Sequence, residues 1–383
     1  MRFKTALKVD LGILRDNYQK IKLLAPGCQL LFVIKSNAYG LGMVPLVSFA
    51  CKQLAIQSFG CASLGEAVYL RHALPDLEFD LFVLSDLDLE MDGGIDYYLS
   101  KRIIPVISSL QKLRWILEKK NCKHLKICLK LDTGMNRLGV KAAELEEVIT
   151  LLKRNQLHQI YHLMSHFSCS SKRIDFSNAN DRSVKQYALY KQMKQRLLDA
   201  GIDIINSSIA NSGAIEQGLG LEENYIRPGL LMYGLSALDP FARTDIYAKK
   251  WNGQNVSALE TNIIESYSIK KNDPIGYGAF PAPNDGILVY LALGYGDGIL
   301  NKYHNTQFYH RGHWGRFVGK ISMDMSAVLF PAESEKMIKV GDNVSFWDHR
   351  QESLLTIADQ NDVIPYEILC NISDRVPRIY IGS

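Results

Sequence analysis

The sequence lacks the signals of several large classes of protein. It has no apolar run long enough to span a membrane, and its start, MRFKTALKVDLGILRDN, contains neither the apolar core nor the small-residue cleavage site of a secretion signal. Its seven cysteines include no C-x-x-C pair, and their odd number argues against a disulfide scaffold. A net charge of +4 is too weak to indicate a nucleic-acid groove or an anionic membrane surface. We therefore expect a cytoplasmic protein with reduced thiols and with no nucleic-acid or membrane partner.

The composition is that of an ordinary globular protein. Of 383 residues, 47% are hydrophobic and 22% are charged. A chain of this length usually exceeds one compact core, so we expect two domains. Neither a fixed-period repeat nor a low-complexity segment interrupts it.

The first 230 or so residues alternate short apolar runs with longer segments of helical period. Strands are predicted at residues 30–34, 59–62, 81–84, 103–107, 127–131, 160–165, 204–209 and 225–227. Helices are predicted at residues 11–24, 44–53, 64–73, 110–118, 144–153 and 183–200. This alternation implies parallel strands joined by crossovers, and eight such units favour a (β/α)8 TIM barrel. A doubly wound sheet is the alternative, but no G-x-G-x-x-G follows the first strand.

One helix start and one domain boundary are marked in the sequence. Ser63 and Glu66 have the spacing of a capping box, in which each side chain satisfies a free amide of the other residue. Residues 236–257 are polar and lack a regular period, so we predict a linker there. The glycine- and proline-punctuated apolar runs beyond it predict strands. The expected organisation is a barrel at residues 1–240 and a C-terminal mainly-β domain at residues 241–383.

Polar side chains follow the predicted barrel strands, where the active site of such a barrel lies. They are Lys35 after the first strand, Lys130 and Arg137 near the fifth, His166 after the sixth, Ser212 after the seventh and Arg227 at the eighth. Gly229, two residues after Arg227, would let the backbone approach a ligand closely. The loops after strands seven and eight often bind phosphate, and a short helix opened by Ser212 would offer amides to an anion. An amine, a phosphate cradle, two guanidiniums and an imidazole suit a pyridoxal phosphate site, in which a lysine holds the aldehyde as a Schiff base.

Each candidate also has an ordinary explanation. Most lysines and arginines are exposed, and a serine after an asparagine is a common helix cap. Histidines 158, 162 and 166 are spaced as metal ligands on a helix would be, but IYHLMSH has a strand-like composition and no H-E-x-x-H is present. We therefore expect no metal site, and only His166 is a functional candidate. Tyr277 and Tyr295 lie in Gly-Tyr-Gly clusters, which suit packed turns as well as general acid–base catalysis.

Nine motifs resemble those of bacterial alanine racemases, in the order of that family. They are VIKSNAYGLG, LKLDTGMNRLG, MSHFS, ANSGA, IRPGLLMYG, GYGAF, LGYGDG, GKISMDM and YEILCNISDRVPR. The resemblance covers nearly the whole chain, from residue 35 to residue 378. It implies a (β/α)8 barrel and a β-domain assembled as a head-to-tail homodimer. It also implies that pyridoxal 5'-phosphate is used to interconvert L-alanine and D-alanine for peptidoglycan.

The resemblance implies a role for each matching residue. Lys35 would hold the cofactor and act as base on one face of the α-carbon, and Tyr277 of the partner subunit would act on the other face. The implied cofactor contacts are Tyr39, Ser212, Tyr366 and the amides around Gly229 and Leu230 for the phosphate, and Arg227 for the pyridine nitrogen, with His166 linking Arg227 towards Tyr277. The remaining implied roles are Arg137 and the partner's Met323 at the substrate carboxylate, Lys130 as a carbamylated lysine and Tyr295 as an entrance gate.

Three other functions share parts of this pattern. A serine or broad-specificity racemase stays open, because a pocket rejects one added hydroxyl only weakly. A non-catalytic pyridoxal phosphate carrier would lack the second domain and its tyrosine. The decarboxylases of basic amino acids would carry H-x-G-S and E-P-G-R stretches, both absent here. The chain departs from the racemase pattern at Leu41, where histidine is usual, and at Met325, where some members have glutamine.

Overall fold

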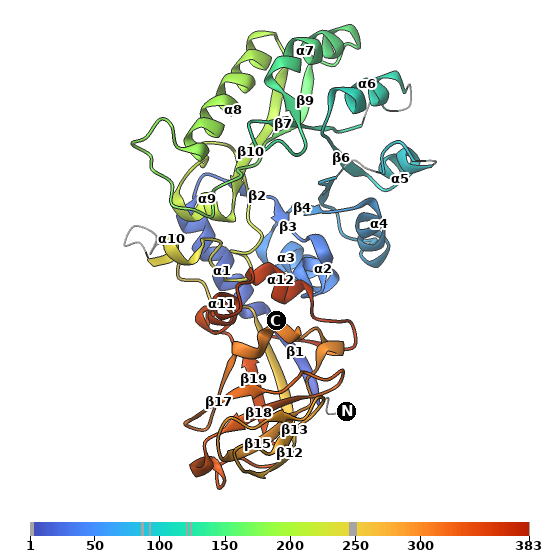
Figure 1. Cartoon of the computed structure of the whole chain (residues 1–383). Helices are drawn as coiled ribbons and strands as arrows, with labels where there is room; N and C mark the ends of the chain where they lie inside the picture. The colour runs from blue at the N-terminus through green and yellow to red at the C-terminus, as the bar shows by residue number, and fades with distance from the viewer. Residues whose placement is uncertain are drawn as a thin grey trace.

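The computed structural model describes residues 4–85, 88–91, 93–119, 122, 125–244 and 251–382. Figure 1 shows a barrel with its surrounding helices at one end of the molecule and a β-rich part at the other. β1 (Thr5–Asp10), the first strand of the described chain, lies among the strands of the β-rich part. The C-terminal segment crosses back to the barrel through two short helices, α11 (Gln351–Gln360) and α12 (Pro365–Cys370).

The barrel is parallel and nearly closed, and each of its predicted strands is confirmed. Its segments are β2 (Gln29–Leu30), β3 (Phe32–Val33), β4 (Ser58–Cys61), β5 (Asp80–Val83), β6 (Ile103–Ile107), β7 (Cys128–Asp132), β9 (Gln159–Met164), β10 (Asp203–Asn211) and β11 (Tyr225–Arg227). β2 pairs with β11 and β3 with β4, so this one strand, broken at Leu31, joins both ends of the sheet. The small β8 (Val140–Lys141) pairs with β7.

The helices predicted for the barrel are present to within two residues at each end. They are α1 (Leu11–Leu24), α3 (Met43–Leu54), α4 (Leu64–Ala73), α6 (Leu110–Glu118), α7 (Leu145–Arg154) and α8 (Arg182–Asp199). The short helices are α2 (Lys35–Tyr39), α5 (Gly94–Ser100), α9 (Ser212–Gln217) and α10 (Pro240–Thr244), with 3-10 turns η2 (Ala142–Glu144), η4 (Tyr295–Asp297), η5 (Asn301–Asn305) and η6 (Ala332–Ser334). Of the short helices, only α9 was expected.

The predicted capping box of α4 is half right. The Ser63 hydroxyl accepts from the Glu66 amide at 3.3 Å, as expected. The Glu66 carboxylate, however, accepts from the amides of Ala62 at 2.7 Å and Asn37 at 3.2 Å. Glu66 therefore ties the start of α4 to the segment that follows Lys35.

The second part of the chain is mainly β, as predicted. Its strands are β12 (Ser257–Ile269), β13 (Pro274–Ile275), β14 (Phe280–Pro281), β15 (Gly286–Leu291), β16 (Gln307–His310), β17 (His313–Val318), β18 (Ser326–Phe330), β19 (Asn343–Trp347) and β20 (Arg378–Ile381). The long β12 pairs with β15 and β19, and β13 and β14 form a separate hairpin.

The first strand belongs to this second sheet and not to the barrel. β1 (Thr5–Asp10) pairs antiparallel with β12 and parallel with β20. Leu7 and Val9 are fully buried, so the strand fills the sheet's core as well as its ladder. The prediction that residues 1–240 form the barrel therefore needs correction at its start. The boundary at residue 240 stays a prediction.

Two further observations concern thiols and membranes. None of the seven cysteines, all of which lie in the described part of the chain, is joined in a disulfide. Within the described part of the chain, no helix combines the length and the apolar character needed to cross a membrane.

Candidate active site

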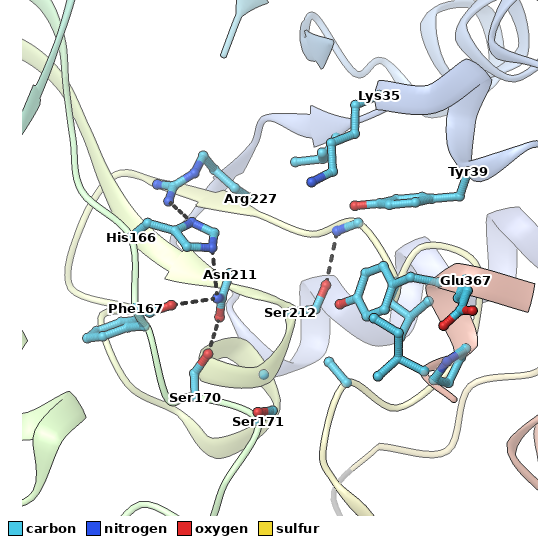
Figure 2. A pocket seen from close by; sticks show the side chains of 18 of the residues that line it. Lys35, Tyr39, His166, Phe167, Ser170, Ser171, Asn211, Ser212, Arg227 and Glu367 are labelled. Carbon is cyan, nitrogen blue, oxygen red and sulfur yellow. Dashed lines mark hydrogen bonds between the residues drawn. The ribbon is translucent and has the colours of Figure 1, made fainter. Parts of the chain in front are cut away.

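A cavity of about 1190 Å³ opens at the carboxyl ends of the barrel strands. It brings together ten of the predicted site residues: Lys35, Tyr39, Lys130, Arg137, His166, Ser212, Arg227, Gly229, Leu230 and Tyr366. Figure 2 shows Lys35 and Tyr39, which both follow β3, around the same space as His166, Ser212 and Arg227, which come from the ends of three other strands. The cavity extends to residues 236–240, in the predicted linker, where α10 begins.

Lys35 stands at the start of a left-handed turn, which the sequence analysis did not predict. Ser36, Asn37 and Ala38 have φ of 53°, 52° and 55°, and Tyr39 continues at 53°. Each such non-glycine residue costs roughly 1–2 kcal/mol, so the surrounding structure must impose the conformation. The turn is what allows Lys35 and Tyr39 to face the same cavity.

Neighbouring elements hold this turn in place. The Asn37 side chain accepts from the Met43 amide at 2.8 Å, while Glu66 accepts from the Asn37 amide. The carbonyl of Leu369 in α12 lies so close that a Cβ on Gly40 would be 2.4 Å from its oxygen. Asn37 and the glycines at 40 and 42 were the signal in the sequence, because these residue types tolerate positive φ.

The end of the cavity that was predicted to bind phosphate is formed by aromatic side chains and a close backbone approach. Tyr39 contacts Tyr233 and Tyr366 edge-on, with ring centroids 5.0 Å and 5.4 Å apart. A Cβ on Gly229 would lie 2.4 Å from the Tyr39 hydroxyl, so glycine is required there. Burial raises the pKa of Tyr39 well above its usual value and that of Tyr366 to about 12. Both therefore carry their hydroxyl protons as hydrogen-bond donors at neutral pH.

Ser212 has a different role from that of a simple helix cap. Asn211 caps α9, since its side-chain oxygen accepts from the Ala214 amide. The Ser212 hydroxyl instead accepts from the amides of Gly229 at 3.0 Å and Leu231 at 3.4 Å. This joins the start of α9 to the loop after β11, so the two predicted phosphate-binding segments form one surface.

Arg227 is a buried guanidinium that donates hydrogen bonds to neutral groups. It donates to the Ser208 hydroxyl, the carbonyls of Ser165 and Ile209, and Nδ1 of His166. Burial lowers its pKa to about 10. At neutral pH it is still a cation, and its acceptors must be held rigidly because no carboxylate among these partners compensates the charge.

His166 is kept neutral by its surroundings. Burial, followed by the charges of Arg227, Lys130, Arg137 and Lys35, lowers its pKa well below the usual value. Its Nδ1 accepts from Arg227 at 3.2 Å, and its Nε2 lies 3.4 Å from the Asn211 side-chain nitrogen. Asn211 was not among the predicted site residues, although its position before Ser212 marked it.

Lys130 and Arg137 enter the cavity from β7 and the loop after it. Lys130 is buried, whereas Arg137 is exposed to the cavity. Asp132 shapes the loop between them, because its side chain accepts from the amides of Gly134 at 2.9 Å and Asn136 at 3.1 Å.

Lys35 and Cys370 lie close together in the cavity. Burial, and then the charge of Arg137, lower the pKa of Lys35. Burial raises the pKa of the Cys370 thiol, although Lys35 acts in the opposite direction. Cys370 was missed in the sequence, because nothing in its spacing connects α12 with a barrel strand.

Three predicted site residues do not line this cavity. Tyr277, at the tip of the β13–β14 hairpin, is 73% exposed, and Tyr295 and Met323 are 45% and 53% exposed. Tyr295 and Met323 lie side by side, since the amides of Tyr295 and Gly296 donate to the carbonyls of Ser322 and Met323. Arg375 fixes this region by donating to the Met323 carbonyl and to Asp324.

No group of three or more His, Cys, Asp and Glu side chains arranged to hold a metal ion occurs within the described ranges. The residues of the cavity instead resemble a site for an organic phosphate and a small anion.

Comparisons with known proteins point to one family. The family model for the N-terminal domain of alanine racemase matches residues 9–237. The family model for the C-terminal domain of alanine racemase matches residues 256–380. The alanine racemase of Pasteurella multocida (strain Pm70) is 31% identical over 382 residues, covering 98% of each chain. A structure of alanine racemase from Clostridium difficile 630 has a TM-score of 0.84 at 25% identity, covering 100% of this chain and 96% of that one. Alanine racemase from Bartonella henselae, with covalently bound pyridoxal phosphate, has a TM-score of 0.82 at 25% identity, covering 99% and 100%.

Proposed function

The chain belongs to the alanine racemase family, and from this membership we propose that it interconverts L-alanine and D-alanine with pyridoxal 5'-phosphate. The observation that carries the proposal is one cavity in which an amine, Lys35, and a buried guanidinium, Arg227, accompany a glycine-lined polar surface. We further propose a cytoplasmic location and a role in providing D-alanine for peptidoglycan.

The residues present fit this cofactor. Tyr39, Tyr366 and Ser212, with the amides around Gly229 and Leu230, would hold the phosphate. Gly229 supports this assignment, because a Cβ there would displace the Tyr39 hydroxyl. Arg227 would donate to the pyridine nitrogen, and Lys35 is the amine available to the aldehyde. When bound, pyridoxal phosphate withdraws electron density from the substrate's α-carbon and so makes the α-proton acidic.

Lys35 is the proposed base on one face of the α-carbon. Its lowered pKa, caused by burial and then by Arg137, increases the fraction of uncharged amine at neutral pH. An uncharged Nζ can accept the α-proton and return it, which is what a base near its working pH requires.

Tyr277 of the partner subunit is the proposed base on the opposite face. Racemisation needs a proton to leave one face and return to the other, so a second group is required. The chain's own Tyr277 is exposed and outside its own cavity, which supports a head-to-tail homodimer in which it enters the other cavity. His166 would then link Arg227 towards that tyrosine.

The substrate carboxylate would be held by Arg137 and the partner's Met323. Lys130, if carbamylated, would carry a negative charge that orients Arg137, and Tyr295 would stand at the entrance to the cavity. Arg227 retains its protons, so it would leave the pyridine nitrogen facing it unprotonated. That arrangement favours rapid return of the proton over side reactions such as transamination.

The test is α-proton exchange in heavy water, followed by proton NMR, on L-alanine, L-serine, L-lysine, L-ornithine and diaminopimelate. We expect the alanine α-proton signal to disappear fastest while the carbon skeleton stays intact. Lys35→Ala is the control and should lose both the exchange and the absorbance of bound cofactor. Preferred exchange of serine would indicate a serine racemase. No exchange from cofactor-loaded protein would indicate a carrier, and loss of the carboxylate a decarboxylase.

A further inference from the structure

His162 lies inside the barrel, four residues before His166 in the sequence. The proposed reaction gives it no role. It sits on β9, beside Cys128 of β7 and Asn206 of β10 in the strand register, and it is fully buried. A buried polar side chain requires hydrogen-bond partners.

His162 is connected to the active site through one serine. Its Nε2 lies 2.7 Å from the Ser208 hydroxyl, and the same hydroxyl accepts from Nη1 of Arg227 at 2.6 Å. His162 and Ser208 are 0% exposed and Arg227 is 4% exposed. The three side chains thus form a continuous buried chain that ends at the guanidinium.

The direction of these hydrogen bonds follows from counting protons. A guanidinium only donates, so a lone pair of Ser208 must face Arg227. The hydroxyl proton of Ser208 then needs an acceptor, and Nε2 of His162 is the partner available to it. This assigns the ring proton of His162 to Nδ1.

The opposite tautomer satisfies fewer groups. Among the residues that the structure describes, Nδ1 has no hydrogen-bond partner, and the ring contacts Phe82 and Tyr225 edge-on, with centroids 5.3 Å and 5.4 Å away. With the proton on Nδ1, only this N–H lacks a conventional acceptor, and the neighbouring aromatic rings can compensate part of that loss through a weak contact. With the proton on Nε2, both a nitrogen lone pair and the Ser208 hydroxyl proton lose their partners.

The ring is held in its neutral form. Burial, followed by the charge of Arg227, lowers the pKa of His162 to about 3. It therefore accepts from Ser208 across the whole physiological range and adds no second cation beside Arg227.

We propose that His162 is a positioning residue for Arg227: by accepting the hydroxyl proton of Ser208, it turns the serine lone pair onto Nη1 and fixes the guanidinium in its cofactor-facing orientation. The inference rests on the proposed function, because the orientation matters only if Arg227 meets the pyridine nitrogen. A guanidinium with neutral partners is especially sensitive to the orientation of the Ser208 hydroxyl, because each acceptor that turns away leaves part of its charge without a hydrogen bond.

The test compares pyridoxal phosphate binding by three variants. His162→Leu removes the acceptor, His162→Gln keeps a side-chain carbonyl that can accept from Ser208, and Ser208→Ala removes the hydroxyl. We expect the Kd for pyridoxal phosphate to rise about tenfold in His162→Leu and in Ser208→Ala, because each variant loses about one hydrogen bond to a charged group. In His162→Gln we expect the Kd to return close to the wild-type value. Because His162 acts through Ser208, the double variant should bind no worse than Ser208→Ala alone.

A merely structural role predicts a different result. In that case His162→Leu would lower the melting temperature without changing the Kd, or its loss of affinity would add to that of Ser208→Ala, and either result overturns the inference. Should His162→Leu fail to fold, nitrogen NMR of histidine-labelled wild-type protein decides the matter, since Nδ1–H is expected and Nε2–H would contradict it. A wild-type protein that binds no pyridoxal phosphate overturns the proposed function and this inference together, whereas unchanged variants beside a binding wild type overturn the inference alone.

Discussion

At the scale of single residues, the barrel strand ends bring only cations to the cavity, whereas the segments after the barrel bring its acidic residues and Arg243. The cations at the barrel strand ends are Lys35, Lys130, Arg137 and Arg227. The acidic residues among its described lining, Asp239, Asp359, Asp362 and Glu367, all come from segments after the barrel, and Asp359 is engaged by Arg243. A phosphate and a carboxylate bound near the strand ends therefore meet positive charge from several sides.

Gly229→Ala tests the close approach at the proposed phosphate site. The new methyl group would overlap the Tyr39 hydroxyl, so we expect pyridoxal phosphate affinity to fall at least tenfold and stability to fall by about 1–3 kcal/mol, as overpacking usually costs. Titration of cofactor absorbance and urea unfolding measure the two effects.

Gly27→Ala is the matched control for this substitution. A Cβ on Gly27 would meet no described atom within 4 Å, so the pyridoxal phosphate affinity and the stability should both stay close to those of the wild type. Equal cofactor affinity in Gly229→Ala and Gly27→Ala would contradict the assignment of Gly229 to the phosphate site.

The identity of most candidate residues could be predicted, but their contacts could not. Strand ends of a parallel barrel converge, so Lys35, His166 and Arg227 were expected to share one site before any distance was known. That Asn211 caps α9 while Ser212 binds two amides of the next loop depends on backbone geometry, which neither residue type reveals. Cys370 enters the cavity through long-range packing that leaves no local pattern.

At the scale of elements, the predictable parts are those with a repeating physical signal. Barrel strands are buried on both faces and therefore appear as continuous apolar runs, which is why all were found. The left-handed turn of α2 has no repeating signal: Asn37 tolerates positive φ, but Ser36, Ala38 and Tyr39 are residues that normally avoid it. Its conformation is imposed by Glu66 and α12, which lie far away in the sequence.

α9 carries a buried carboxylate that gives stability a pH dependence. Glu216 is 2% exposed and accepts from the Ser236 hydroxyl at 2.7 Å and the Ala237 amide at 3.1 Å, joining α9 to the segment after the barrel. Burial raises its pKa from 4.5 to about 7 despite these bonds. The folded protein thus retains a proton that the unfolded chain loses, and stability falls as the pH rises through this interval.

Glu216→Gln removes this titration while keeping the side-chain shape. We expect the variant to equal the wild type near pH 4.5 and to be more stable above pH 7, by an amount on the order of 3 kcal/mol. Urea unfolding at several pH values measures the difference. Glu118→Gln, at an exposed position of α6, is the control and should show no such trend. A constant difference across the pH range would contradict the account.

At the scale of the whole molecule, the two parts of the chain are interdependent. β1 lies in the β-rich sheet, and its last residue, Asp10, caps α1 of the barrel. In the other direction, α12 returns from the second part of the chain to line the cavity. The β-rich part in turn exposes Tyr277, Tyr295 and Met323, which are not used by the cavity of the same chain. This arrangement supports the proposal that each active site is completed by a second copy of the chain.

Mixing two inactive variants tests this claim most directly. Lys35→Ala and Tyr277→Phe should each be inactive as homodimers, the second with cofactor still bound. After the two are unfolded and refolded together, about half of the dimers contain one chain of each kind, and each of these has one site with an intact Lys35 and the partner's intact Tyr277. We predict that alanine racemisation recovers to about a quarter of the wild-type rate. If Tyr277 instead served its own chain, no mixed dimer would contain a complete site, and a mixture as inactive as its parents would contradict the account.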